Sequence, residues 1–93
     1  MTFKLIFPEN YDEYAWEAEA KGYLTGVTVT VKELTISLLF YDPVRLAQDI
    51  EEMISLNQVF AEKNVVVVSN VNRITIETAV ASLFGTGDIY RLT

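Results

Sequence analysis

The side chains of this sequence that could do chemistry are carboxylates, amines and phenols, because the 93 residues include no histidine and no cysteine. A Ser-His-Asp triad and zinc sites built on His or Cys are therefore excluded. Two carboxylates can hydrolyse a glycosidic bond when they face each other across a substrate. Among the neighbouring acids only Glu17 and Glu19 would share a face, and only on a strand. Because acids on an exposed strand are ordinarily just solvated, we expect no catalytic residue. We also expect no metal and no cofactor.

The segment from residue 9 to residue 19 combines five carboxylates with three aromatic rings and contains no basic residue. Tyr and Trp are frequent energetic anchors of protein interfaces, and clustered acids speed the encounter with a basic partner. The alternative is that the aromatic rings belong to the hydrophobic core and that the acids are the solvated face of the same element. On the first interpretation, the partner-binding residues are Asp12, Tyr14, Trp16, Glu17 and Glu19.

The charge balance is acidic, with a formal net charge of −6 at pH 7 and seven basic residues spread singly along the chain. Nucleic acids and anionic membranes attract clustered Lys and Arg, so neither is an expected direct partner. No apolar run approaches the ~20 residues that span a bilayer, and the first residues do not read as a secretion signal. We therefore expect a cytoplasmic protein with one domain over residues 1–93.

Alternating apolar residues predict the first strands. Residues 2–7 form one such run, and Pro8 ends it. Residues 27–31 alternate Val with Thr. In residues 34–40, Leu34, Ile36, Leu38 and Phe40 alternate with Thr35 and Ser37, and only two polar residues separate the two runs. This arrangement predicts an antiparallel hairpin, although a tight hairpin turn prefers Gly or Asn. Residues 22–26, which contain two glycines, are expected to form a turn.

Residues 10–21 fit two periodicities. As a helix, the segment would have Asn10 as its N-cap and Gly22 just past its end. Trp16 would then lie outside the apolar face of that helix. As a strand, it would place Tyr14, Trp16, Ala18 and Ala20 on one side. We favour the strand, because an uncovered Trp is hard to explain.

The second half of the chain predicts two helices. Asp42 and Pro43 are a good N-cap and first residue for a helix that extends to Asn57, and residues 72–84 predict a second helix. Residues 65–68 are four consecutive valines, which predicts a strand buried on both faces near the centre of the sheet. Residues 88–92 are expected to add a short edge strand. The predicted fold class is α+β: two layers, with a mostly antiparallel sheet of five or six strands and two helices packed on one face.

Residues 14–19, Tyr-Ala-Trp-Glu-Ala-Glu, follow an acidic turn, and in this they resemble the second strand of small HicB-type antitoxins. The resemblance covers less than a third of the chain. Directly afterwards the chain departs from that pattern, with two further predicted strands before the helix and no appended DNA-binding segment. No residue role is transferred from that family.

The expected function is that of a non-enzymatic, acidic protein-binding module. Small size, acidity and the missing catalytic side chains favour a protein that occupies a basic surface of its partner, as inhibitors, antitoxins and immunity proteins do. The alternative is a small structural or assembly protein that associates with itself as a homodimer, for which valine-rich strands and a lightly charged sheet edge would be suited.

Overall fold

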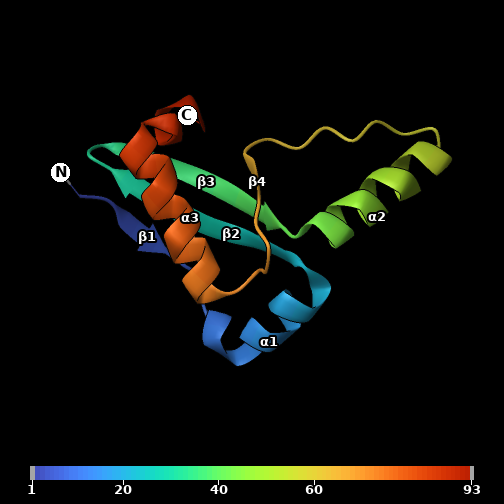
Figure 1. Cartoon of the computed structure of the whole chain (residues 1–93), viewed down its shortest axis with the longest axis horizontal. Coiled ribbons are helices and arrows are strands. Elements are labelled where there is room, and N and C mark those ends of the chain that lie inside the picture. The colour runs from blue at the N-terminus through green and yellow to red at the C-terminus, as the bar shows by residue number, and fades with distance from the viewer. Residues whose placement is uncertain (1, 93) are drawn as a thin grey trace.

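The computed structural model describes residues 2–92, which form one four-stranded sheet, three α-helices and a terminal 3₁₀ helix (Figure 1). The sheet order is β1-β2-β3-β4. The β1–β2 and β2–β3 pairs are antiparallel, and β4 runs parallel to β3. In chain order the elements are β1 (Lys4–Ile6), α1 (Tyr11–Lys21), β2 (Tyr23–Val31), β3 (Leu34–Tyr41), α2 (Pro43–Ser55), β4 (Val65–Val67), α3 (Arg73–Thr86) and η1 (Asp88–Leu92).

The predicted hairpin is confirmed as β2 and β3, in which Val29 pairs with Ile36 and Val31 with Leu34. Its two-residue turn forms without Gly or Asn because Lys32 itself adopts the left-handed conformation, with φ 56°. Alternation sends one set of side chains from both strands into the core. This buried set consists of Val27, Val29, Val31, Ile36, Leu38 and Phe40.

The start of β2 differs from the expected turn over residues 22–26. Gly22 ends α1 in the left-handed conformation, and the strand begins at Tyr23. The register then shifts between Leu24 and Val27, where Gly26 has a φ of 83°. Glycine accepts that backbone without steric cost, so the bulge needs no break in the strand.

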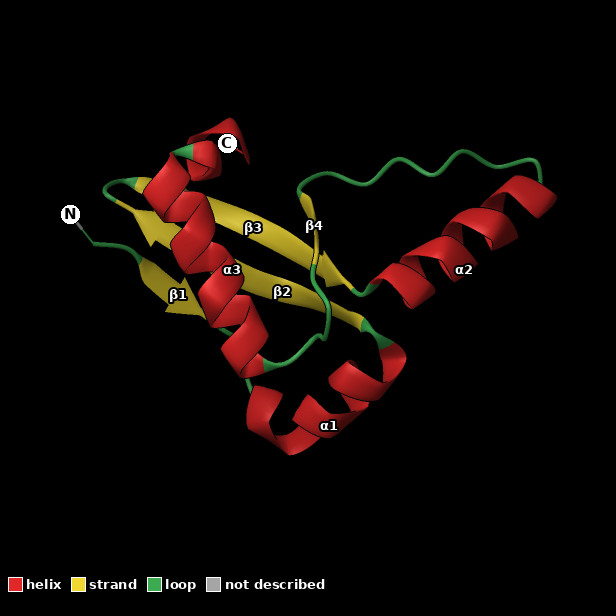
Figure 2. Ribbon diagram, in the orientation of Figure 1, coloured by secondary structure: helices red, strands yellow, loops and turns green. Residues whose placement is uncertain are grey.

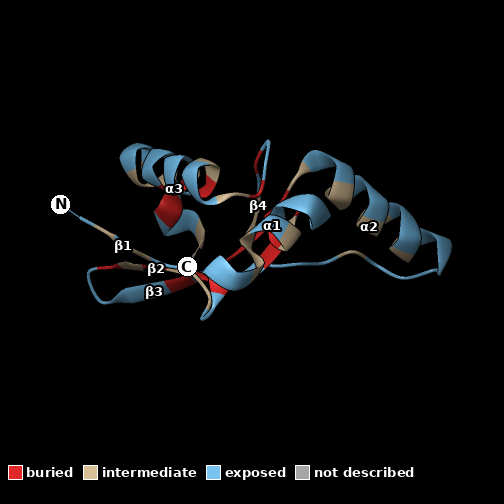
Figure 3. Ribbon diagram, turned by 90° about the horizontal axis from the view of Figure 1, so that it is seen from below, coloured by how far each residue is buried: buried red, intermediate tan, exposed pale blue. Residues whose placement is uncertain are grey.

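One helix, α3, lies across one face of the sheet (Figure 3). The predicted helix over residues 72–84 is confirmed, with the side chain of Asn72 accepting a hydrogen bond from the backbone N–H of Thr75 at 2.9 Å. Ile76 and Val80 are fully buried against the sheet, and Ile89 of η1 closes the same core. These contacts bring the last quarter of the chain against the first strands.

Residues Tyr11–Lys21 form a helix, so the prediction of a strand is wrong. The helix buries Tyr11 and Ala18, while Trp16 points away from the core and remains 70% exposed. The argument for a strand assumed that the Trp must be covered, and this fold instead leaves it in solvent. The strand on which the likeness to HicB-type antitoxins depended is therefore absent from the described residues.

Two further strand predictions are corrected. The valine run forms β4 at an edge of the sheet and not at its centre, because it pairs only with β3 and Val67 is 48% exposed. Residues 88–92, expected as an edge strand, form η1. Since residues 10–21 are helical as well, the sheet within residues 2–92 has four strands in place of five or six. A β-branched run indicates a strand but not its position in the sheet.

The helix predicted after Asp42 exists as α2, but it does not pack on the face of the sheet. It leaves the end of β3 and projects from the body of the molecule, and residues 56–64 return without regular structure to β4 (Figure 2). No residue of α2 is buried, although its apolar residues follow a helical stripe. Of the three α-helices within residues 2–92, α1 and α3 contribute buried side chains to the core. We call α2 and residues 56–64 together the arm.

Candidate functional site

A cavity of about 390 Å³ opens where the arm leaves the sheet. Aromatic rings come from the ends of β2 and β3 and from the returning segment of the arm, while α2 contributes charged side chains and a thioether. We call it the arm cavity. Its lining residues are Tyr23, Tyr41, Arg45, Asp49, Glu52, Met53, Phe60 and Glu62.

The hairpin places the aromatic wall of the arm cavity. Tyr23 is the first residue of β2 and Tyr41 the last of β3, and the antiparallel register sets them opposite each other. Their ring centroids lie 5.0 Å apart in an edge-on arrangement. Phe60 from the returning segment meets the Tyr41 ring at 6.2 Å, also edge-on. Such ring contacts are attractive beyond simple area burial, so Tyr41 anchors both sides of the wall.

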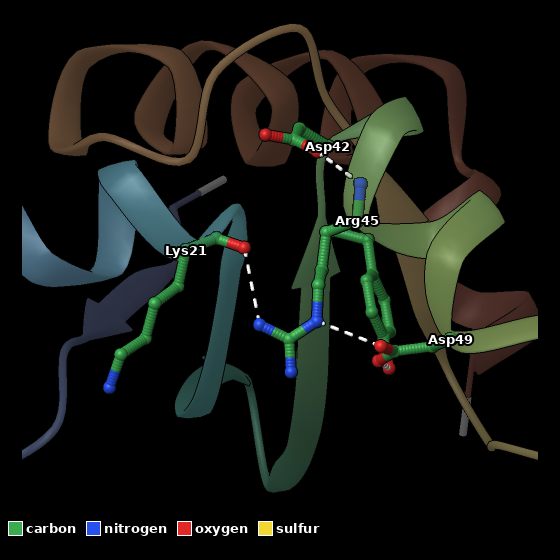
Figure 4. A network of polar contacts seen from close by, with 5 residues as sticks. Lys21, Asp42, Arg45 and Asp49 are labelled. Atoms are coloured by element: carbon green, nitrogen blue, oxygen red, sulfur yellow. Dashed lines mark hydrogen bonds and ion pairs between the residues drawn. The ribbon is translucent and has the colours of Figure 1, made fainter. Parts of the chain in front are cut away.

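A polar network fixes the base of α2 to the rest of the molecule (Figure 4). The Asp42 carboxylate accepts a hydrogen bond from the backbone N–H of Arg45 at 2.7 Å, which caps the helix. The Arg45 guanidinium donates to Asp49 at 2.8 Å and to the carbonyl of Lys21 at 3.2 Å. The Tyr41 hydroxyl donates to the other Asp49 oxygen at 2.8 Å. The network therefore joins α2 to both β3 and the end of α1.

These contacts set the charge states of the site. Partial burial would raise the pKa of Asp49, but the hydrogen bonds from Arg45 and Tyr41 outweigh it and leave that pKa below its ordinary value. Burial, together with the hydrogen bond to Asp49, raises the pKa of the Tyr41 phenol. At neutral pH the site thus holds an ionised Asp49 beside a neutral tyrosine and a charged arginine.

The other two carboxylates of the arm cavity have no such partners. Within residues 2–92 the side chains of Glu52 and Glu62 make no ion pair and no hydrogen bond. One guanidinium therefore faces three carboxylates, and the lining has a net charge of −2. Because Arg45 is already bound to Asp49, the negative potential of Glu52 and Glu62 is directed at the open space.

The sequence-predicted residues Asp12 and Glu19 lie elsewhere, where they hold α1 against the start of α3. Arg73 is 2.9 Å from Asp12, and the amide of Asn72 donates to Glu19 at 2.8 Å. The Arg73 guanidinium also lies over the Phe7 ring, 4.2 Å from its centroid. These two acids thus have a structural contact each, although Asp12 remains exposed.

The sequence-predicted residues Tyr14 and Glu17 lie beside the arm cavity. They line a second cavity of about 170 Å³, which also involves Lys21 and shares Tyr23 with the first. Glu17 lies 3.7 Å from Lys21 one turn later on α1. Trp16 belongs to neither lining and stands exposed on the same helix. The structure therefore brings Tyr14 and Glu17 next to the new site, but not Asp12 and Glu19.

The main cavity residues were missed in the sequence because they come from three distant segments. One signal was present. If Val31 pairs with Leu34, counting outwards along the two strands places Tyr23 one residue away from Tyr41. The register shift between Leu24 and Val27 then sets the two tyrosines opposite each other. The i, i+4 spacing of Arg45 and Asp49 also indicated their ion pair. No periodicity could have placed Phe60 or Glu62, since their segment has no regular structure.

Comparison with known proteins gives no family for this chain: no protein-family model, no curated protein and no solved structure matches it. Among the described residues, no helix is long and apolar enough to cross a membrane. Nor do residues 2–92 bring together three acids that could hold a metal ion.

Proposed function

We propose that this protein is a non-enzymatic binding module that holds a basic segment of a partner protein. The observation that carries the proposal is the arm cavity, in which three aromatic rings accompany three carboxylates and a single arginine. Aromatic side chains supply contact area at low conformational cost, and unpaired acids attract a basic partner and select against an acidic one. The net charge of −6 reinforces the same preference over a longer distance.

The proposed surface extends beyond the arm cavity. Through Tyr23 it continues to the second cavity with Tyr14 and Glu17, and the exposed Trp16 stands on the same helix. An exposed Trp next to acids is the composition expected of an interface anchor. A module of this kind can block a basic functional surface, as an inhibitor, antitoxin or immunity protein would.

Affinity capture from a cell lysate, at low and high salt, tests this proposal. We expect the wild-type chain to retain a basic protein that is released at high salt, because salt screens the attraction between exposed charges and the Debye length is only ~3 Å at 1 M. The triple variant Glu17→Lys, Glu52→Lys and Glu62→Lys should lose that partner. The matched control variant Glu9→Lys, Glu33→Lys and Glu77→Lys reverses the same number of acids, all exposed and outside both cavities, and should keep it. A partner that survives the triple variant would contradict the proposal.

A second candidate function, self-association as a homodimer, is favoured by the apolar stripe of α2, which is only partly covered. Leu46, Ile50, Met53 and Ile54 recur at helical spacing, no residue of the helix is buried, and Ile54 is 63% exposed. Two copies could bury this stripe by an isologous contact. Sedimentation equilibrium at high micromolar concentration would show a dimer that Ile50→Glu abolishes. A monomer at that concentration would exclude the homodimer.

A further inference from the structure

The acidic and aromatic lining of the arm cavity suits a cationic side chain. Building on the proposed function, we infer that it receives a single lysine or arginine side chain of the partner, with the cationic head group placed between Glu52 and Glu62. This inference names the recognition element within the proposed interface.

Arg45 is an internal example of a cation bound at this site. Its guanidinium lies 5.2 Å from the centroid of the Tyr23 ring and donates to Asp49 at 2.8 Å. An aromatic face and a carboxylate together are a favourable environment for a guanidinium. This internal pair occupies the Tyr23 end of the cavity and uses Asp49, so the rest of the lining is left for a second cation.

The rest of the lining is acidic and has no cation of its own. Glu52 comes from α2 and Glu62 from the returning segment, and both face the same space without an ion pair among residues 2–92. Like charges that line one cavity repel, and a cation bound in the same cavity reduces that repulsion. A neutral side chain would leave both acids unpaired, and an anionic one would add a third negative charge.

The size and the apolar parts of the cavity fit a long, flexible cationic side chain. Its volume of about 390 Å³ is at the lower end of the range for ligand pockets, ~300–1,000 Å³. Met53 and the Phe60 ring offer apolar contact to the methylene stem, while the charged head reaches the carboxylates. No three acids within the described residues are arranged to hold a metal ion, which favours an organic cation over a bare divalent one.

Two-dimensional NMR titration of the whole protein tests the inference with three small probes: n-butylguanidinium, n-butylammonium and neutral n-butanol. We expect either cation to shift the resonances of Tyr41, Glu52 and Phe60 saturably, and n-butanol not to shift them. The double variant Glu52→Gln and Glu62→Gln should bind the cations roughly tenfold more weakly or worse, because it lacks both free carboxylates. The control Glu33→Gln and Glu77→Gln removes two exposed acids outside the cavity and should bind within about twofold of wild type.

The inference is overturned if neither cation shifts these resonances, if n-butanol binds as tightly as the cations, or if the double variant binds like wild type. The variants change only exposed acids, so their spectra also report that the fold is retained. Failure here is distinct from failure of the proposed function. Loss of a captured partner in the triple variant, with no cation bound in the cavity, would retain the module and refute the inference. Cation binding in the cavity, with no salt-sensitive partner captured, would support the cation site and refute the protein-binding function.

Discussion

Replacing Asp49 by Asn tests whether the contacts of this carboxylate hold the arm in place. The helix α2 has no buried residue, so its attachment depends on a few interactions at its base. Asp49 takes part in two of them, accepting from Tyr41 at 2.8 Å and from Arg45 at 2.8 Å. Asn is nearly the same size but carries no charge, and one of its two terminal atoms is a donor. The substitution therefore weakens both contacts without creating a void.

The magnitude follows from the exposure of the pair. A hydrogen bond to a charged group contributes ~1.5–3 kcal/mol where water is excluded. The side chains of Arg45 and Asp49 are 32% and 23% exposed, so solvent screening reduces this value. We expect a loss of about 1 kcal/mol, which makes opening of the arm roughly fivefold more frequent.

Amide hydrogen exchange measures this opening. In Asp49→Asn we expect faster exchange in α2, with the central strands β2 and β3 unchanged, because the core does not depend on the arm. Glu51→Gln is the matched control, since Glu51 is an exposed acid of the same helix outside the cavity lining. Unchanged exchange in Asp49→Asn, or an equal effect in Glu51→Gln, would refute the argument.

The same carboxylate makes the arm sensitive to acid. Because the folded state lowers the pKa of Asp49, its contribution to stability is complete above the unfolded value, ~3.9, and is lost as the pH falls through the lower folded value. The titration of Asp49 should therefore leave exchange in α2 unchanged near neutral pH and accelerate it only below about pH 4. In Asp49→Asn this acid-induced component should be absent.

Three further substitutions test other parts of the fold by urea unfolding. Trp16→Ala should change the free energy of unfolding by less than ~0.5 kcal/mol, because the ring is 70% exposed, and a larger loss would place the ring in the core. Gly22→Ala should destabilise by at least ~1 kcal/mol, since the backbone has φ 70° and a Cβ would collide with the Asp42 carboxylate; equal stability would contradict this geometry. Phe40→Ala should cost ~3–5 kcal/mol because the ring is fully buried, and a loss below ~1 kcal/mol would contradict its central position.

The hairpin and the two later helices could be predicted because short-range sequence signals define them. Val27, Val29 and Val31 alternate with threonines, and the same alternation serves a sheet with one covered face. Asp42 and Asn72 were readable as helix N-caps because capping involves only residues three positions apart. Where one short segment satisfied two periodicities, as around Trp16, local pattern could not decide.

Only part of the candidate site could be predicted from the sequence. Trp16, Tyr14 and Glu17 attracted attention because aromatic rings and acids are concentrated in one short segment. Glu52 lies on a predicted helix, but nothing in the sequence marks it as a site residue. Phe60 and Glu62 belong to a segment without regular structure, and only the return of the arm brings the three residues to one space. Asp12 and Glu19 had the right composition for an interface, but Arg73 and Asn72 contact them from the other end of the chain.

By itself, the sequence determined which side-chain chemistry is missing and several of the elements that form. The absence of histidine and cysteine, the acidity, the β2–β3 hairpin and the N-caps of α2 and α3 all follow from residue types and short spacings. Only the tertiary structure decided that residues 11–21 are helical, that the valine run lies at an edge of the sheet and that α2 projects from the body. The reason is that periodicity records which side of an element is apolar, whereas long-range packing determines what, if anything, covers that side.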